Sequence, residues 1–115
     1  MNVTPLPITG AFVLDPIVRP DARGEFFELF KASAFREATG HELVVAQTNV
    51  SVNRVGAVRG IHYADVPPGQ AKLVACLHGA VLDVIVDLRV GSPTLGAVET
   101  VRLDAEGHRT VYLAE

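Results

Sequence analysis

The sequence predicts an all-β domain, an antiparallel sandwich or barrel, with one short helix near residues 31–40. Apolar and polar residues mostly alternate with a period of two, which is typical of strands that bury one face. Short apolar runs recur at close spacing between turns rich in Gly, Pro, Asn and Asp, as in antiparallel sandwiches and barrels. A chain of 115 residues holds a single core, so we expect one domain over residues 1–115.

The N-terminal part is expected to contain two short strands, residues 11–14 and 25–30, separated by a turn with proline and glycine. The helix follows at residues 31–40, where Ser33 is placed to cap its beginning and Gly40 to end it. A helix this short is stable only when it packs against other elements. We therefore expect it to cover part of a sheet.

From residue 44 onward, strand is expected to follow strand, because each apolar segment is bounded by turn residues. In the run 81–88, aliphatic side chains alternate with Asp83, Ile85 and Asp87. One face of that strand is therefore aliphatic, and the other must be solvated or hydrogen-bonded. The expected strands are residues 44–52, 57–61, 71–77, 81–88, 97–103 and 110–113.

Composition excludes several classes of protein. Ten Lys and Arg residues stand against 13 Asp and Glu, a formal net charge of −3, without a basic block, so the electrostatic footprint of a nucleic-acid binder is missing. No apolar run approaches the length of a membrane span, and the N-terminus lacks the pattern of a signal peptide. The single cysteine, Cys76, fits a reducing compartment. We expect a cytoplasmic protein without a nucleic-acid or membrane partner.

A group of polar side chains interrupts the apolar sequence between residues 47 and 62. Such side chains are costly to bury without partners, so their clustering indicates a lined pocket. Gln47 and Asn49 are two residues apart and share one face of a strand. Arg59 and His62 are three apart and point to opposite faces, so both reach one site only if the chain bends at Gly60.

From the residues alone, each candidate has two interpretations. His62 is suited to take a proton near neutral pH, or it is a buried structural histidine. Lys72 would stabilise a developing oxyanion, or it is a surface lysine whose stem lies on apolar neighbours. Arg23 and Glu28 would bind a ligand, or they form an exposed ion pair. Asp83 and Asp87 are solvated, or one of them orients the imidazole of His62.

A metal site is not expected. Metal-binding β-barrels of this size place two histidines two residues apart, with a glutamate close behind, so that three ligands share a face. Here His62 is followed by Tyr63 and Ala64, and the sequence contains no His-x-His pair. We therefore predict no metal site.

Several blocks carry a resemblance to a known family. They are Asp21-Ala-Arg-Gly-Glu-Phe-Phe-Glu28, Gln47-Thr-Asn-Val-Ser51, Val58-Arg-Gly-Ile-His-Tyr63, Gly69-Gln-Ala-Lys-Leu-Val74 and the run 79–96. Together, and in this order, they resemble the dTDP-4-dehydrorhamnose 3,5-epimerase family over residues 11–113.

The resemblance implies a jelly-roll, cupin-like fold, a homodimer and an enzyme without a cofactor. The implied substrate is dTDP-4-keto-6-deoxyglucose or a related sugar nucleotide, epimerised beside its ketone in deoxysugar and dTDP-rhamnose biosynthesis. His62 would be the catalytic base, and Lys72 would stabilise the enolate. Arg23 and Glu28 would serve the neighbouring subunit's site. The implied substrate-binding residues are Arg23, Glu28, Gln47, Thr48, Asn49 and Arg59.

The resemblance also implies residues beyond this sequence. Family members continue past the stretch matching Val111-Tyr-Leu-Ala-Glu115 into a segment with a tyrosine acid, a further histidine and an aspartate that pairs with the base. Neither Tyr63 nor Tyr112 matches that tyrosine by motif. Three interpretations therefore stay open: an epimerase acting at C3, C5 or both, a sugar-nucleotide-binding remnant without catalysis, and a structural β-domain that dimerises.

Overall fold

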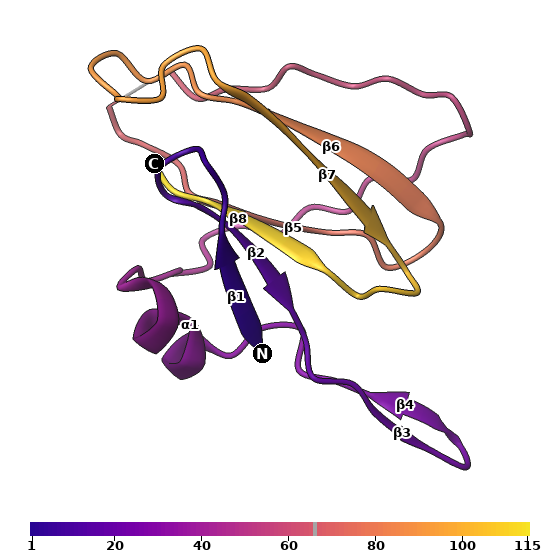
Figure 1. Ribbon diagram of the computed structural model, residues 1–115. Coiled ribbons are helices and arrows are strands. Elements are labelled where there is room, and N and C mark those ends of the chain that lie inside the picture. Colours follow the sequence, from indigo (N-terminus) through magenta and orange to yellow (C-terminus); the bar gives the residue numbers. More distant parts are fainter. Residues whose placement is uncertain (66) are drawn as a thin grey trace.

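The computed structural model describes residues 1–65 and 67–115, and it consists mainly of antiparallel strands with one short helix (Figure 1). The all-β prediction is therefore confirmed. The elements are β1 (Asn2–Pro5), β2 (Ala11–Asp15), β3 (Arg19–Asp21), β4 (Gly24–Phe26), α1 (Ala32–Thr39), β5 (Lys72–Ala75), β6 (Ala80–Val86), β7 (Val98–Asp104) and β8 (Thr110–Leu113).

A four-stranded sheet, in the order β1-β2-β8-β5, forms the central layer. On one face, α1 inserts Phe35, whose fully buried ring lies 4.7 Å from the ring of Tyr112. On the opposite face lies the antiparallel β6–β7 pair (Figure 1). The core between these two sheets consists of Ile8, Ala11, Val13, Ile85, Val101, Leu103 and Val111.

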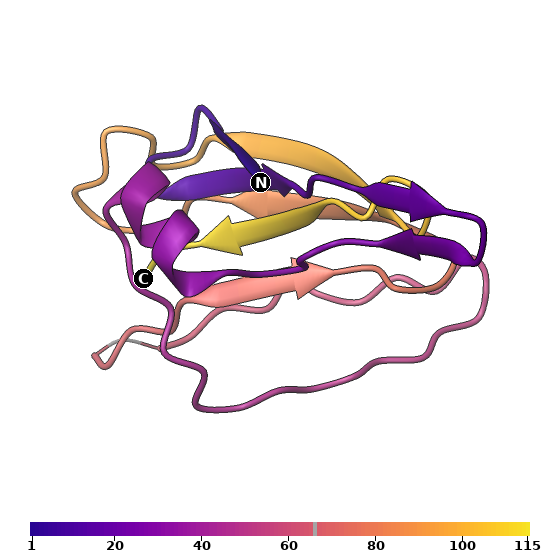
Figure 2. The same cartoon turned by 90° about the horizontal axis from the view of Figure 1, so that it is seen from below.

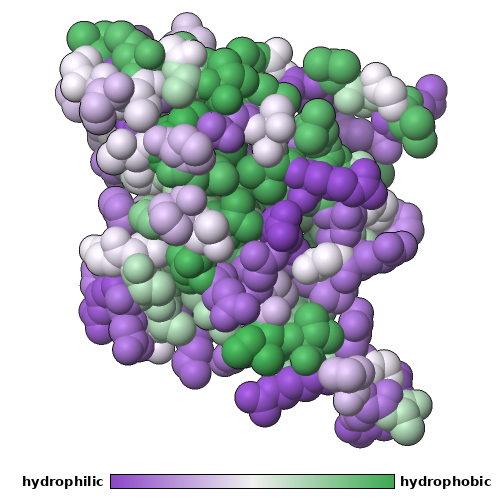
Figure 3. Space-filling view, in the orientation of Figure 1, coloured by the Kyte–Doolittle hydropathy of each residue, from purple (hydrophilic) through white to green (hydrophobic). Residues whose placement is uncertain are grey.

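Strand β6 directs its face with the aspartate inward and its aliphatic face outward. The face that carries Asp83 and Ile85 is directed toward the central sheet, since Ile85 belongs to the core between the sheets. The aliphatic face lies outward, with Leu82 66% and Val84 48% exposed. Figure 3 shows hydrophobic side chains gathered in the upper part of the molecule, where Figure 1 places β6 and β7. Exposed apolar surface of this kind is typical of an interaction face.

The N-terminal region differs from the sequence-based expectation. The strand predicted at residues 25–30 ends already at Phe26, and two strands were not predicted, β1 and β3. Both contain proline, which reads as a strand breaker, but each lies at the edge of its sheet, where a missing N–H donor is tolerated.

The helix lies where the sequence predicts it, but its N-cap residue differs from the predicted one. Lys31 is the N-cap and makes no side-chain capping bond, so the prediction that Ser33 caps the helix is wrong. Gly40 ends α1 in the left-handed conformation, with φ 74°, as predicted. No helix among the described residues has the length and apolar character needed to cross a membrane.

The prediction of strands at residues 44–52 and 57–61 is wrong. Residues 41–65 contain only irregular chain and turns, which run out and back along the molecule (Figure 2). Their side chains are largely exposed, for example Val50 at 89% and Val58 at 95%. Alternating, β-prone sequence forms a strand only where a neighbouring strand accepts its hydrogen bonds, and none of the described strands pairs with this segment.

Candidate active site

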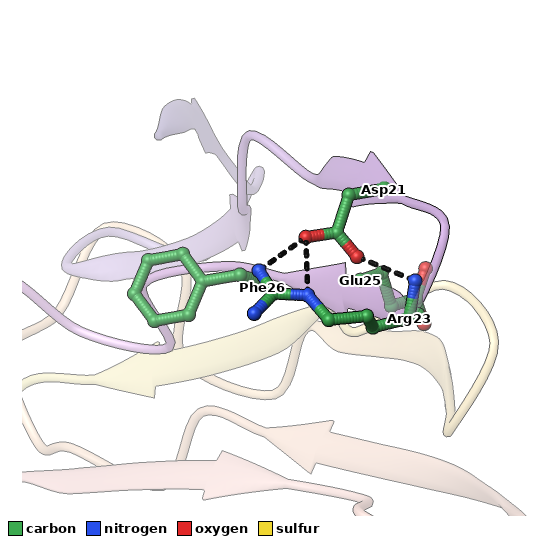
Figure 4. A pocket seen from close by; sticks show the side chains of 5 residues that line it. Asp21, Arg23, Glu25 and Phe26 are labelled. Carbon is green, nitrogen blue, oxygen red and sulfur yellow. Dashed lines mark hydrogen bonds and ion pairs between the residues drawn. The ribbon is translucent and has the colours of Figure 1, made fainter.

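The β3–β4 hairpin forms an arm that extends from the body of the molecule (Figure 1). Arg23 lies in its turn, with its side chain 90% exposed and paired to Asp21 at 2.7 Å (Figure 4). The guanidinium and backbone N–H of Arg23 hold the pKa of Asp21 below its usual value. Glu28 follows the arm and is also exposed, 3.7 Å from the Lys31 ammonium. Both predicted ligand residues are therefore accessible to a molecule outside this chain.

The base of the arm is attached to the loop before β8. The His108 ring stacks on Phe27 with ring centroids 4.0 Å apart. Its Nε2 atom lies 2.7 Å from Oε1 of Glu25, and the side chain is only 10% exposed. An isolated two-stranded hairpin is at best marginally stable in water, so these contacts hold the arm in place.

The polar cluster predicted at residues 47–62 lies on the irregular segment. Gln47 and Asn49 project to the same side, as their spacing requires, because Nε2 of Gln47 donates to Oδ1 of Asn49 at 2.9 Å. Thr48 between them is exposed. Arg59 donates from Nε to Oδ1 of Asn53. These amide and guanidinium groups are available to a ligand.

His62 is exposed, which contradicts the alternative that it is a buried structural histidine. Gly60 lies in the same irregular segment and has φ 118°. A Cβ atom at Gly60 would lie 3.5 Å from Cδ2 of His62, so the imidazole lies close to this glycine. A residue other than glycine would be strained at this φ.

Lys72 occupies a different environment, at the edge of the space between the two sheets. It pairs with Leu113 across β5 and β8, as Val74 pairs with Val111, and those three aliphatic side chains belong to or pack against the core between the sheets. Lys72 therefore lies on the inner face of β5. It is partly buried, which fits a lysine stem that lies on apolar neighbours, so both interpretations of Lys72 remain open.

Asp83 lies on the inner face of β6, which is directed toward the central sheet. Its Oδ2 atom is buried and has no hydrogen-bond partner among residues 1–65 and 67–115. Burial raises the pKa of this carboxyl, while the backbone N–H of Val84 and the Lys72 charge partly oppose the rise. Raised pKa values in partly enclosed carboxyls are typical of functional sites.

Asp87, just after β6, is the opposite case, and sequence reasoning missed its role. Its side chain is fully buried. Oδ1 accepts from Nε of Arg89 at 2.9 Å, and Oδ2 accepts from Ser92 Oγ at 2.6 Å and Thr94 Oγ1 at 2.7 Å. Arg89 also donates to the carbonyl of Thr9 at 2.6 Å, which ties this loop to the turn before β2.

The candidate residues do not form one assembled site within the described chain. None of the ion pairs between described residues includes His62, Lys72 or Arg59. Within the same residues, no three His, Cys, Asp or Glu side chains are grouped so that they could hold a metal ion. The structure instead presents three parts: the arm, the irregular segment with His62, and the space between the sheets with Lys72.

Comparison with known proteins decides the family. The family model described as dTDP-4-dehydrorhamnose 3,5-epimerase matches residues 5–115. The chain belongs to this family. A dTDP-4-dehydrorhamnose 3-epimerase of Streptomyces niveus is 53% identical over 115 residues, which are 100% of this chain and 56% of the relative. The resemblance found in the sequence is thus confirmed.

Two solved structures confirm the fold. A 4-keto-6-deoxy sugar epimerase from the novobiocin biosynthetic gene cluster of Streptomyces spheroides matches with TM-score 0.95 and 53% identity, over 100% of this chain and 58% of that one. A 3′-monoepimerase from Streptomyces bikiniensis, solved in complex with dTDP-quinovose, matches with TM-score 0.88 and 52% identity, over 96% and 56%. The jelly-roll, cupin-like prediction is confirmed, and the chain spans little more than half the length of these epimerases.

Proposed function

We propose that the protein epimerises a dTDP-4-keto-6-deoxy sugar at the carbon next to the ketone. The observation that carries this proposal is the family match over residues 5–115, which includes every candidate site residue. The Streptomyces relatives named above are epimerases of sugars of this class, and they include a 3-epimerase and a 3′-monoepimerase. The same 115 residues would supply the base and the enolate-stabilising cation.

The chemistry follows from two side chains. His62 would take the proton from the carbon beside the ketone, and the electrons of that C–H bond would move to the ketone oxygen. The enolate oxygen so formed would be stabilised by the Lys72 ammonium, which matters more as solvent is excluded. A proton returned to the other face of the carbon would complete the inversion. The exposed imidazole and the partly buried lysine side chain are compatible with these roles.

The remaining candidates would bind the nucleotide and the sugar. Arg23 and Arg59 present guanidinium groups that match diphosphate oxygens. Glu28 and the side chains of Gln47 and Asn49, with Thr48 between them, would hydrogen-bond the base and the sugar. The outward projection of the arm supports a site shared between two subunits, with Arg23 and Glu28 serving the partner.

The protein is further proposed to be a cytoplasmic homodimer that uses neither a metal nor a cofactor. The exposed aliphatic face of β6 and the exposed arm support an assembly of two copies. The single cysteine supports a reducing compartment.

Solvent deuterium exchange tests the proposal directly. The protein is incubated in D₂O with dTDP-4-keto-6-deoxyglucose, and NMR follows label at C3 and C5. We expect exchange in the unaltered protein and a loss of at least about 100-fold in His62→Ala, because general-base catalysis contributes about 10²–10⁴-fold. Label at C3 alone would identify a 3-epimerase, and label at both carbons a 3,5-epimerase.

His78→Ala is the matched control, since His78 is another exposed histidine, in the turn before β6. It should exchange at the unaltered rate. Exchange that persists in His62→Ala would refute the assigned base. Binding of dTDP without exchange would replace the epimerase with a sugar-nucleotide-binding protein, and absence of both would favour a structural β-domain.

A further inference from the structure

We propose that Asp83 is the positioning residue for Lys72, whose ammonium it directs into the space between the two sheets. This inference rests on the proposed epimerase function for its catalytic meaning. Its structural basis is independent of that function, because it follows from strand register and from the burial of one carboxylate oxygen.

The register brings the two side chains to facing surfaces. On β5, Lys72 shares a face with Val74, which packs against the core between the sheets. On β6, Asp83 shares a face with Ile85 and pairs with Val101, and both belong to that core. Because side chains two apart in a strand point the same way, Lys72 and Asp83 both project into the space between the two sheets.

The surroundings of Asp83 require a partner. Oδ2 is buried, and no described residue donates a hydrogen bond to it. A buried carboxylate oxygen without a donor costs free energy that a purely structural residue would have no reason to retain. Val101, its partner across β7, is 4% exposed and apolar, so it satisfies neither oxygen.

Lys72 is the cation whose charge acts on the Asp83 carboxyl. Its charge acts on Asp83 in the direction of an attractive partner, opposing the effect of burial on the pKa of the carboxyl. A lysine has a long, flexible stem, so its ammonium adopts a defined position only when an anion or a hydrogen-bond acceptor fixes it. Among the described residues the two groups form no direct ion pair. Asp83 therefore acts on the ammonium through its charge, and the N–H donors of Lys72 stay available for a substrate oxygen.

The sequence left open whether Asp83 orients His62 instead. The structure favours Lys72, because His62 is exposed on the irregular segment whereas Asp83 lies on the inner face of β6. Asp83 therefore acts through the cation rather than through the base, and it does not itself contact the reacting carbon.

Kinetics of Asp83→Asn in the intact protein test the proposal. We expect kcat for epimerisation to fall about 10–100-fold with KM nearly unchanged, as for loss of a residue that orients a catalytic group. Asp83→Glu should recover part of the rate. Glu106→Gln removes an exposed turn carboxylate as the matched control and should change none of these values.

A second measurement does not depend on activity. The carboxyl carbon of Asp83 is titrated by ¹³C NMR in the unaltered protein and in Lys72→Met. We expect its midpoint to move to higher pH in the variant, because an attractive charge has been removed. An unchanged midpoint in Lys72→Met, or an unchanged kcat in Asp83→Asn, overturns the proposal. Absence of exchange in the unaltered protein would refute the epimerase function while leaving the titration result to stand.

Discussion

Asp83 and Asp87 are the same residue type, four positions apart on one face of β6 and its continuation, but they occupy opposite environments. Asp87 is enclosed by donors from Arg89, Ser92 and Thr94. Asp83 has a buried oxygen without a donor among the described residues. Accordingly, the Arg89 guanidinium and the two hydroxyl groups hold the pKa of Asp87 well below its usual range, whereas burial raises that of Asp83.

This contrast separates a carboxylate that stabilises the fold from one that we propose positions Lys72. The fully satisfied aspartate stabilises the fold, because its charged form gains more from the guanidinium and hydroxyl donors than it loses by burial. The buried oxygen of Asp83 that has no donor instead costs stability.

The largest expected effect is at Asp87. Asp87→Ala would leave the partly buried Arg89 guanidinium without its partner and would release the loop from the turn at Thr9. Breaking a buried ion pair by removing one partner costs about 3–5 kcal/mol, so we expect the free energy of unfolding to fall by about that amount in urea denaturation.

The control for that experiment is Asp21→Ala, which breaks the exposed pair with Arg23 at the tip of the arm. Its unfolding midpoint should equal that of the unaltered protein, since exposed ion pairs contribute little. Equal losses of unfolding free energy in the two variants would show that burial adds nothing to the contribution of the Asp87–Arg89 pair.

A smaller loss is expected at one donor of the same network. Thr94→Val keeps the shape of the side chain but removes the hydroxyl that donates to Oδ2 of Asp87 at 2.7 Å. Arg89 and Ser92 continue to satisfy that oxygen, so we expect a loss of about 1 kcal/mol, typical of one hydrogen bond. Thr100→Val, at an exposed position on β7, should stay within about 0.5 kcal/mol of the unaltered protein. A neutral Thr94→Val would mean that the network is redundant.

The sequence predicted the sandwich because its strongest patterns are local. Residues 81–88 and 97–103 alternate clearly, and each forms a strand that pairs with the other in register. The runs 44–52 and 57–61 alternate just as well but remain irregular, because pairing depends on a neighbouring strand that local sequence does not specify. The same limit concealed β1 and β3, whose prolines are tolerated only because their strands lie at sheet edges.

The sequence indicated a set of candidate residues and not a geometry. Motif resemblance pointed to His62 and Lys72 as catalytic residues. The bend expected at Gly60 assumed a strand that the structure does not contain, so a site shared by Arg59 and His62 stays a prediction. Sequence could not distinguish Asp83 from Asp87, which share one alternating pattern. The difference arises from the loop after β6, whose Ser92 and Thr94 hydroxyls reach only the second aspartate.

The smallest expected effect, opposite in sign, is at Asp83. Its pKa in the folded chain lies above the unfolded value of 3.8, so the folded state binds more protons there, and stability falls as pH rises through the range above 3.8. Asp83→Asn removes this dependence. Relative to the unaltered protein it should gain stability with rising pH, by no more than about 0.5 kcal/mol near neutrality, because solvent screens a half-exposed carboxylate.

Asp87 gives the opposite slope in the same titration. Its lowered pKa means that the stability it contributes is present above 3.8 and is lost as pH falls below that value. Urea unfolding midpoints are measured between about pH 3 and 7. The midpoint of Asp83→Asn should exceed that of the unaltered protein by more as pH rises. The deficit of Asp87→Ala should shrink as pH falls. A destabilised Asp83→Asn with a reduced rate would assign both losses to misfolding. Reduced kcat in a variant of equal or higher stability would instead mark Asp83 as a residue that supports catalysis at a cost to the fold.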